Sequence, residues 1–130
     1  MTTGMPDFCI GLRSLGYEPT TYDQMPNYVT VPWWVPCGRF VGQKITLGFV
    51  VPVDFPLTTP SGPHSTPILA ADDGTGQPPR GGLHLNHDPN FKALTGDDWQ
   101  YWSRPYPAWN SPEHPVAAYM AFIKKLWADI

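Results

Sequence analysis

The stretch QKITLGFVVPVDFPLTTP, residues 43–60, decides the fold that we expect for this chain. Its apolar residues occupy every second position: Ile45, Leu47, Phe49, Val51, Val53 and Phe55. Because side chains on a strand alternate between its two faces, the pattern predicts a strand with one wholly apolar face. The other face is smaller and mixed in polarity, and we expect it to be more open to solvent. Pro52 cannot donate a ladder hydrogen bond, so it marks the end of the strand or a sheet edge.

The composition of the whole chain limits the classes of function. A length of 130 residues is typical of one domain, so we assign residues 1–130 to a single unit. The net charge of −3, with no basic run, argues against a nucleic-acid partner. There is no basic-then-apolar N-terminal signal and no apolar run of membrane-spanning length, so we expect a cytoplasmic protein without a membrane partner. Two cysteines are too few for a disulfide scaffold or a zinc knot, and we expect no metal and no cofactor.

Two helices are expected near the ends of the chain. The first covers residues 5–15, with Thr2 or Thr3 as its N-cap, and its apolar face comprises Phe8, Leu12 and Leu15. The second opens at Ser111 and Pro112, and apolar residues recur in it at steps of three and four: Val116, Tyr119, Met120, Ile123, Leu126, Trp127 and Ile130. We expect this second helix to cover the apolar face of the sheet.

Between the helices the sequence predicts a further strand, a long loop and an aromatic segment. Residues 28–35 favour a strand, whereas residues 61–82 are rich in proline and glycine, and loops of that length are usually functional. The segment around Asp98, Trp99 and Trp102 has no strand or helix period, which is typical of a segment that seals a loop onto a core. The predicted class is therefore α+β: an N-terminal helix, an antiparallel meander of about four strands, the long loop, and a C-terminal helix on the sheet.

The sequence offers few residues for covalent or metal chemistry. Cys37 lies in a predicted turn with Arg39 as its nearby cation, so it is a candidate reactive thiol. Cys9, by contrast, fits the core as a small apolar side chain. His84 and His87 form a His-x-x-His pair, but a metal site needs a third ligand at a fixed spacing. Hydrogen bonding at the surface is the commoner role of such histidines.

The predicted order of elements resembles that of the ubiquitin-conjugating enzymes, whose domain is the UBC-like or E2 fold. Residues 49–56, FVVPVDFP, look like that family's strand and its Phe-Pro-x-x-Tyr-Pro exit. Residues 82–85, GLHL, are similar to the Gly-x-x-Cys-Leu active-site segment, and Trp102-Ser103 is similar to the Trp-Ser-Pro that follows it. The likeness is closer still to the divergent bacterial group called prokaryotic E2 family E, and it extends from about Phe8 to Trp127.

The resemblance implies a function in a bacterial ubiquitin-like protein conjugation pathway. The implied partners are an E1-like adenylating enzyme of the ThiF type, a ubiquitin-like modifier and a JAB-type metalloprotease. The resemblance also implies that the E1-like enzyme docks on the first helix, where we expect Asp7 and Arg13 to be exposed. His84 stands at the position that matches the family's cysteine, and no cysteine follows Cys37. The usual thioester therefore cannot form in the usual place.

Three functional hypotheses follow. The one that we favour is a binding module, a pseudo-E2 that binds the E1-like enzyme or the modifier without carrying the acyl group. The second is an active transferase with a non-standard nucleophile: His84, Ser103 or Cys37. The third is a small aromatic-rich ligand-binding domain outside the pathway. We expect His84 to lie in a shallow groove, with binding residues along its side: Asp98, Trp99 and Trp102.

Overall fold

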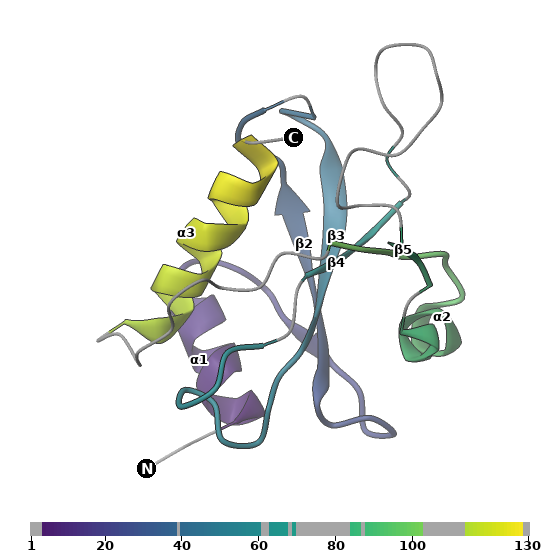
Figure 1. Cartoon of the computed structure of the whole chain (residues 1–130). Coiled ribbons are helices and arrows are strands. Elements are labelled where there is room, and N and C mark those ends of the chain that lie inside the picture. Colours follow the sequence, from purple (N-terminus) through teal and green to yellow (C-terminus); the bar gives the residue numbers. More distant parts are fainter. Residues whose placement is uncertain are drawn as a thin grey trace.

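The computed structural model describes residues 4–38, 40–60, 63–67, 69, 84–86, 88–102 and 114–128, with only the backbone at 84 and 85. This part of the chain forms an α+β fold, which confirms the predicted class (Figure 1). The elements follow the order α1 (Met5–Ser14), β1 (Thr20–Thr21), β2 (Tyr28–Trp34), β3 (Lys44–Val50), β4 (His64–Thr66), β5 (His84–Leu85), α2 (Pro89–Thr95), β6 (Gln100–Tyr101) and α3 (Pro115–Ala128). None of the described helices is long and apolar enough to cross a bilayer.

The strands form one antiparallel sheet in the order β1-β2-β3-β4-β6-β5. The first four strands are a meander, as predicted, and β6 and β5 extend the sheet beyond it. The longest pairing joins β2 to β3 over seven residues, from Tyr28 opposite Val50 to Trp34 opposite Lys44. Strand β4 lies inside the segment for which only a long loop was predicted. Its polar sequence has no alternation, and its pairing with the free side of β3 makes it a strand.

The central strand is shorter than the alternation of apolar residues suggests. Strand β3 ends at Val50, and Val53, which we placed on the apolar face, is 75% exposed. Pro52 cannot continue the ladder, and its carbonyl accepts a hydrogen bond from the Phe55 N–H at 3.1 Å in a turn. The turn returns Phe55 to the core, where its ring meets Phe8 edge to face with centroids 5.2 Å apart.

Helices α1 and α3 lie side by side on one face of the sheet (Figure 1). Gly11 allows their close approach, because a Cβ at this position would overlap the Val116 side chain. Helix α3 begins at Pro115 and buries the predicted stripe over its described length: Val116, Tyr119, Met120, Ile123, Leu126 and Trp127. The Trp127 ring packs against Trp33, Phe40 and Trp102. The prediction that this helix covers the apolar face is confirmed; Ile130, Ser111 and Pro112 lie outside the described residues.

Both ends of α1 differ from the expectation. The N-cap is Gly4 instead of Thr2 or Thr3, and its N–H donates to the Phe55 carbonyl at 2.8 Å. Its φ of 68° is a conformation that favours glycine. At the other end, Leu15 lies beyond the last helical residue and is 43% exposed. Gly16 follows Leu15 and has a φ of 91°, a left-handed conformation that ends the helix. Leu15 therefore does not join the buried face.

The opposite face of the sheet is also covered, contrary to the expectation of an open face. Helix α2 packs there, on the side of the sheet away from α1 and α3 (Figure 1). A Cβ at Gly48 would lie 2.5 Å from the Phe91 ring and 2.9 Å from the Trp99 ring. Gly48 therefore lets two large aromatic side chains rest directly on the central strand.

Removal of buried volume from α3 should destabilise the fold far more than loss of a charge on the same helix. Ile123→Ala should lower the free energy of unfolding by about 2–5 kcal/mol, because Ile123 is fully buried. The matched control, Lys125→Ala, removes an exposed side chain and should cost less than about 1 kcal/mol. Urea unfolding followed by circular dichroism measures both. Equal losses in the two variants would show that α3 does not form the core.

Candidate functional site

The candidate site is the sheet edge formed by β4, β6 and β5, where the resemblance places an active-site position. His84 opens β5, and its backbone pairs with Tyr101 of β6. On its other side, Tyr101 pairs with His64 of β4. Three residues that are far apart in the sequence thus form one row across the sheet. The structure supports the placement of His84 next to the aromatic segment at the level of the backbone.

His64 lies buried in this row, although the sequence placed it in a loop. Only 2% of its surface is exposed. Its ring lies between two aromatic neighbours, with centroids 4.5 Å from Phe91 and 4.8 Å from Tyr101. The imidazole therefore belongs to the packing between the sheet and α2.

Asn86 fixes the direction of the chain immediately after β5. Its φ is 48°, a left-handed conformation that asparagine tolerates better than most residues. Its backbone N–H donates to the Trp99 carbonyl at 2.7 Å, and its side-chain oxygen accepts from the Trp99 N–H at 2.9 Å. Its amide nitrogen donates to Asp98 Oδ1 at 3.0 Å. Asn86 thus connects β5 to the segment before β6, a role that sequence reasoning missed.

Asp98 is exposed beside this connection. Lys92 Nζ lies 2.9 Å from Asp98 Oδ1, and both side chains are about half exposed. The hydrogen bond from Lys92, and after it the hydrogen bond from Asn86, lowers the pKa of the Asp98 carboxyl. Of the three predicted groove residues, Asp98 alone presents its side chain to solvent.

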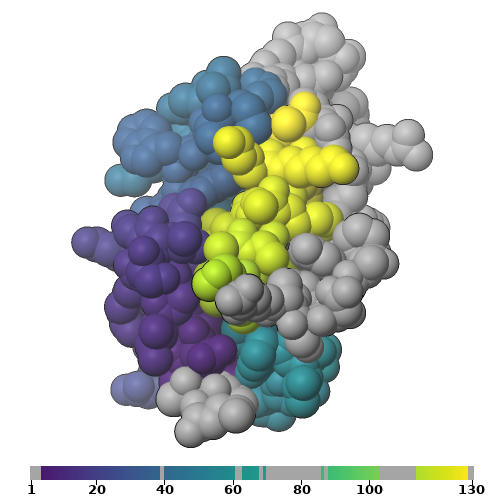
Figure 2. Space-filling model, turned by 90° about the vertical axis from the view of Figure 1, so that its left-hand side faces the viewer, coloured from purple at the N-terminus to yellow at the C-terminus, as the bar shows by residue number. Residues whose placement is uncertain are grey.

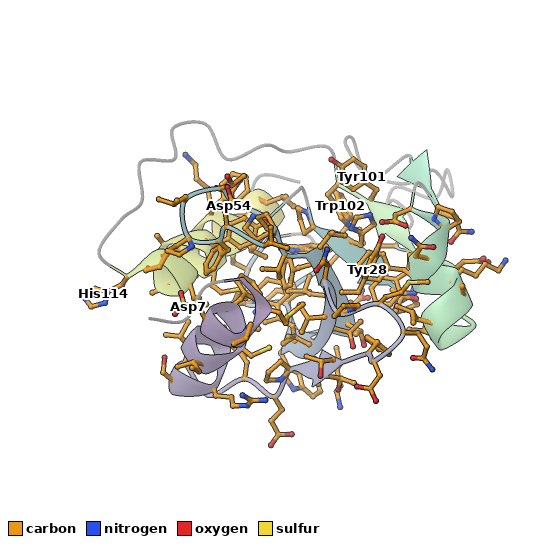
Figure 3. All side chains as sticks on the ribbon, turned by 90° about the horizontal axis from the view of Figure 1, so that it is seen from below. Asp7, Tyr28, Asp54, Tyr101, Trp102 and His114 are labelled. Atoms are coloured by element: carbon orange, nitrogen blue, oxygen red, sulfur yellow. The ribbon has the colours of Figure 1, made fainter. Side chains whose placement is uncertain are left out.

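Helix α2 is attached to the sheet by a hydrogen-bonded triad of Tyr28, Asp88 and Asn90. The Tyr28 hydroxyl donates to Asp88 Oδ2 at 2.7 Å and accepts from Asn90 Nδ2 at 2.8 Å. Asp88 Oδ1 caps the helix by accepting from the Asn90 N–H at 3.0 Å. Burial is the main cause that raises the pKa of the Tyr28 hydroxyl. Figure 3 shows Tyr28 between the sheet and α2.

The two tryptophans assigned to the side of the groove are core residues. Neither Trp99 nor Trp102 has exposed surface. The Trp99 indole N–H donates to Thr95 Oγ1 at 2.8 Å, and the Trp102 indole N–H donates to Ser65 Oγ at 2.8 Å. The expectation that these side chains line an open groove is therefore wrong. Burial of large aromatic surface, with each indole N–H satisfied internally, determines their positions.

Leu69, within the segment 61–82, is bonded to this edge by Gln100. Gln100 is buried in β6, and its amide oxygen accepts from the Leu69 N–H at 2.6 Å. Its amide nitrogen donates to the Leu69 carbonyl at 3.2 Å. Leu69 itself is buried. Leu69 thus anchors its segment to the core.

The other predicted site residues lie elsewhere or outside the described part of the chain. Cys37 follows β2, and its thiol donates to the Lys124 carbonyl of α3 at 3.5 Å. Asp7 and Arg13 occupy the first and last turns of α1, on the face opposite α2. Ser103 is outside the described residues, as are Leu83 and His87. The structure therefore places Asp98 and Trp99 just before β6, whose Tyr101 pairs with His84, and it places Cys37, Asp7 and Arg13 elsewhere.

The groups described at this edge suit recognition better than covalent chemistry. They comprise carboxylates, amides, a lysine and a phenol, and no described cysteine lies among them. In the described ranges no three side chains of histidine, cysteine, aspartate or glutamate are grouped to hold a metal ion. Such an arrangement can hold an element in place or bind a polar partner through hydrogen bonds.

The pKa of Asp98 should depend on Lys92. In Lys92→Ala the Asp98 pKa should rise toward its ordinary value, because the largest lowering contribution is lost. A carboxyl with a lowered pKa contributes stability above its ordinary pKa, and this contribution is lost as the pH falls through the lowered value. The measurement is an NMR titration of the Asp98 carboxyl carbon, with Lys44→Ala as the control. An unchanged Asp98 pKa in Lys92→Ala would contradict the ion pair.

The triad should stabilise α2 selectively. Tyr28→Phe removes the hydroxyl that donates to Asp88 and accepts from Asn90. This loss should lower the free energy of unfolding by about 1–3 kcal/mol. Amide hydrogen exchange should accelerate in α2 more than in α3. The matched control is Tyr17→Phe, since Tyr17 makes no side-chain hydrogen bond within the described part of the chain. Equal exchange rates in α2 of the two variants would show that the triad is not what holds the helix.

No family model matches the chain, and neither a curated protein nor a solved structure matches it.

Proposed function

We propose that this protein is an E2-like binding module of a bacterial ubiquitin-like protein conjugation pathway. In this proposal it binds an E1-like adenylating enzyme, its modifier, or both, and carries no cysteine thioester. The observation that carries the proposal is the position of the two thiols, because neither lies at the edge that matches the family's active site. The order of an N-terminal helix, a four-strand meander and a C-terminal helix on the sheet supports the UBC-like assignment.

Neither cysteine is placed to serve as a nucleophile at β5. Cys9 is buried in α1, and burial raises the pKa of its thiol more than the nearby Arg13 lowers it. The Cys37 thiol donates to the Lys124 carbonyl of α3 at 3.5 Å. Cys37 follows β2 near one side of the sheet, whereas β5 is the edge strand on the other side. Since the thiolate is the nucleophile, neither residue supports an acyl relay at β5.

Helix α1 offers a surface that fits a protein partner. Ile10 is 56% exposed, and Arg13 is exposed one turn later. A hollow of about 380 Å³ separates α1 from the start of α3 and is lined by Asp7, Ile10, Ser14, His114 and Pro115. Figure 3 shows Asp7 and His114 at the same end of the molecule. An exposed apolar residue flanked by charges of both signs is a suitable anchor for an E1-like enzyme.

The proposal predicts that binding depends on α1 and not on His84. Ile10→Glu should weaken binding of the E1-like enzyme from the same genome at least about tenfold, since it places a charge at the apolar anchor. The matched control, Ala93→Glu, adds the same charge to an exposed position of α2 on the other side of the sheet. His84→Ala should leave the dissociation constant almost unchanged. Calorimetry measures all three, with circular dichroism as the check of folding.

The transferase alternative makes the opposite prediction. If His84 acts as an acid or base, His84→Ala should reduce modifier transfer by about 10²–10⁴-fold at constant affinity. The assay mixes the purified components with ATP and separates products on gels with and without reductant or hydroxylamine. A reductant-sensitive adduct that disappears in Cys37→Ala would overturn the proposal. Failure to bind both the E1-like enzyme and the modifier would favour a ligand-binding domain outside the pathway.

A further inference from the structure

Strand β1 covers only part of the outer edge of β2. The pairing contains two residue pairs, Thr20 with Thr30 and Thr21 with Val29. Strand β2 continues to Trp34, and within the described ranges no strand pairs with this second half on its outer side. A free strand edge presents unpaired N–H and carbonyl groups, which is the template for pairing with another chain.

The pairing with β3 shows which groups of β2 point outward. The Val35 N–H donates to the Gln43 carbonyl, and the Val51 N–H donates to the Asn27 carbonyl. Both pairs continue the register of β2 and β3. The backbone N–H and carbonyl groups of the odd-numbered residues of β2 therefore bond to β3, and those of the even-numbered residues point to the outer edge. Pro32, which has no N–H, fits this alternation. The outward groups beyond β1 are therefore the Pro32 carbonyl and both backbone groups of Trp34, and no backbone partner for them occurs among the described residues.

A groove of about 660 Å³ runs beside this edge. It is lined by Leu15, Tyr17, Trp33, Trp34, Met120 and Lys124, among others. In Figure 2 it lies where the purple α1 region, the blue β2 region and yellow-green α3 meet. Trp34 is 63% exposed, whereas Trp33 and Met120 are nearly buried and form an apolar wall. The groove is thus large enough and apolar enough to hold a side chain that points down from an added strand.

The charges around the groove are unequal at its two ends. Near Trp34, Lys124 lines the groove and Lys44 Nζ lies 5.8 Å from the Trp34 ring centroid. Beside Leu15, at the other end, Glu18 is in the lining. A bound segment with a carboxylate in the groove would meet Lys124, whereas Lys44 pairs with Trp34 and lies on the sheet face away from α3. Charge complementarity therefore selects an acidic residue at that end of the ligand.

We infer that the edge of β2 and this groove bind an extended peptide segment of a partner protein by strand addition. The peptide backbone pairs with Pro32 and Trp34, one apolar side chain occupies the groove, and an acidic residue lies beside Lys124. An ordinary peptide has an N–H at each residue, so it can donate to both outward carbonyls, those of Pro32 and Trp34. A second copy of this chain would bring the same excess of carbonyls. The inference does not depend on the function proposed above, which uses the adjoining hollow around Ile10.

The test begins with a phage-displayed library of random linear nine-residue peptides, selected against the full chain. Affinities of the enriched peptides are then compared for Trp34→Ala and Trp34→Pro. Both variants lose the indole, but only proline removes the outward N–H. Because that N–H makes no bond to β3, proline should be tolerated here as it is at Pro32, which circular dichroism can verify. Trp34→Pro should bind about 3–10-fold more weakly than Trp34→Ala, the loss expected for one hydrogen bond.

Two further measurements locate the peptide. Lys124→Glu should weaken binding more than Lys125→Glu, since Lys125 is an exposed neighbour outside the groove lining. N-methylation of successive peptide amides should reduce affinity at alternate positions only, as expected for a strand. Equal affinities of Trp34→Ala and Trp34→Pro, or enrichment of no peptide, would overturn the inference. Self-association of the parent chain that is lost in Trp34→Pro would assign the edge to a second copy instead.

Discussion

The seven-residue pairing of β2 and β3 is the constraint on which the rest of the structure depends. Its register presents Val31, Leu47 and Phe49 to one face, where α1 and α3 cover them. A slip by one residue would turn all of these side chains to the other face. The same register sets Gly48 opposite Thr30 and beneath Phe91, so α2 can pack on the second face. One pairing thus determines where all three helices lie.

The two ends of the sheet have different chemistry as a result. At the β5 end, buried aromatic rings and internal hydrogen bonds leave carboxylates, amides and Lys92 at the surface. At the β2 end, backbone groups remain unpaired within the described part of the chain, and an apolar groove lies beside them. The first end has no described thiol, and the second is the surface for which we propose an extended peptide ligand.

Long and strongly periodic elements could be predicted from the sequence, and short ones could not. Helix α3 and strand β2 are long enough for the apolar period to show. Helix α2 was missed although Asp88, Pro89 and Gly96 are local signals of its start and end, because seven residues are too few for a visible period. Strand β4 has no alternation, and only its pairing with β3 and β6 makes it a strand. Pro52 was identified as a strand end, but the return of Phe55 to the core depends on contacts with α1.

The sequence by itself determined the α+β class, the terminal helices, the meander and the absence of a cysteine after Cys37. These properties depend on composition and on the apolar period within single elements, and both can be read from neighbouring residues of the sequence. Tertiary structure alone decided that Trp99 and Trp102 are buried and that Asn86, Asp98 and Lys92 meet. It also decided that no strand among the described residues pairs with the edge at Trp34, because β1 ends after two pairs. Such features arise from contacts between separate segments, and no local pattern encodes which segments meet.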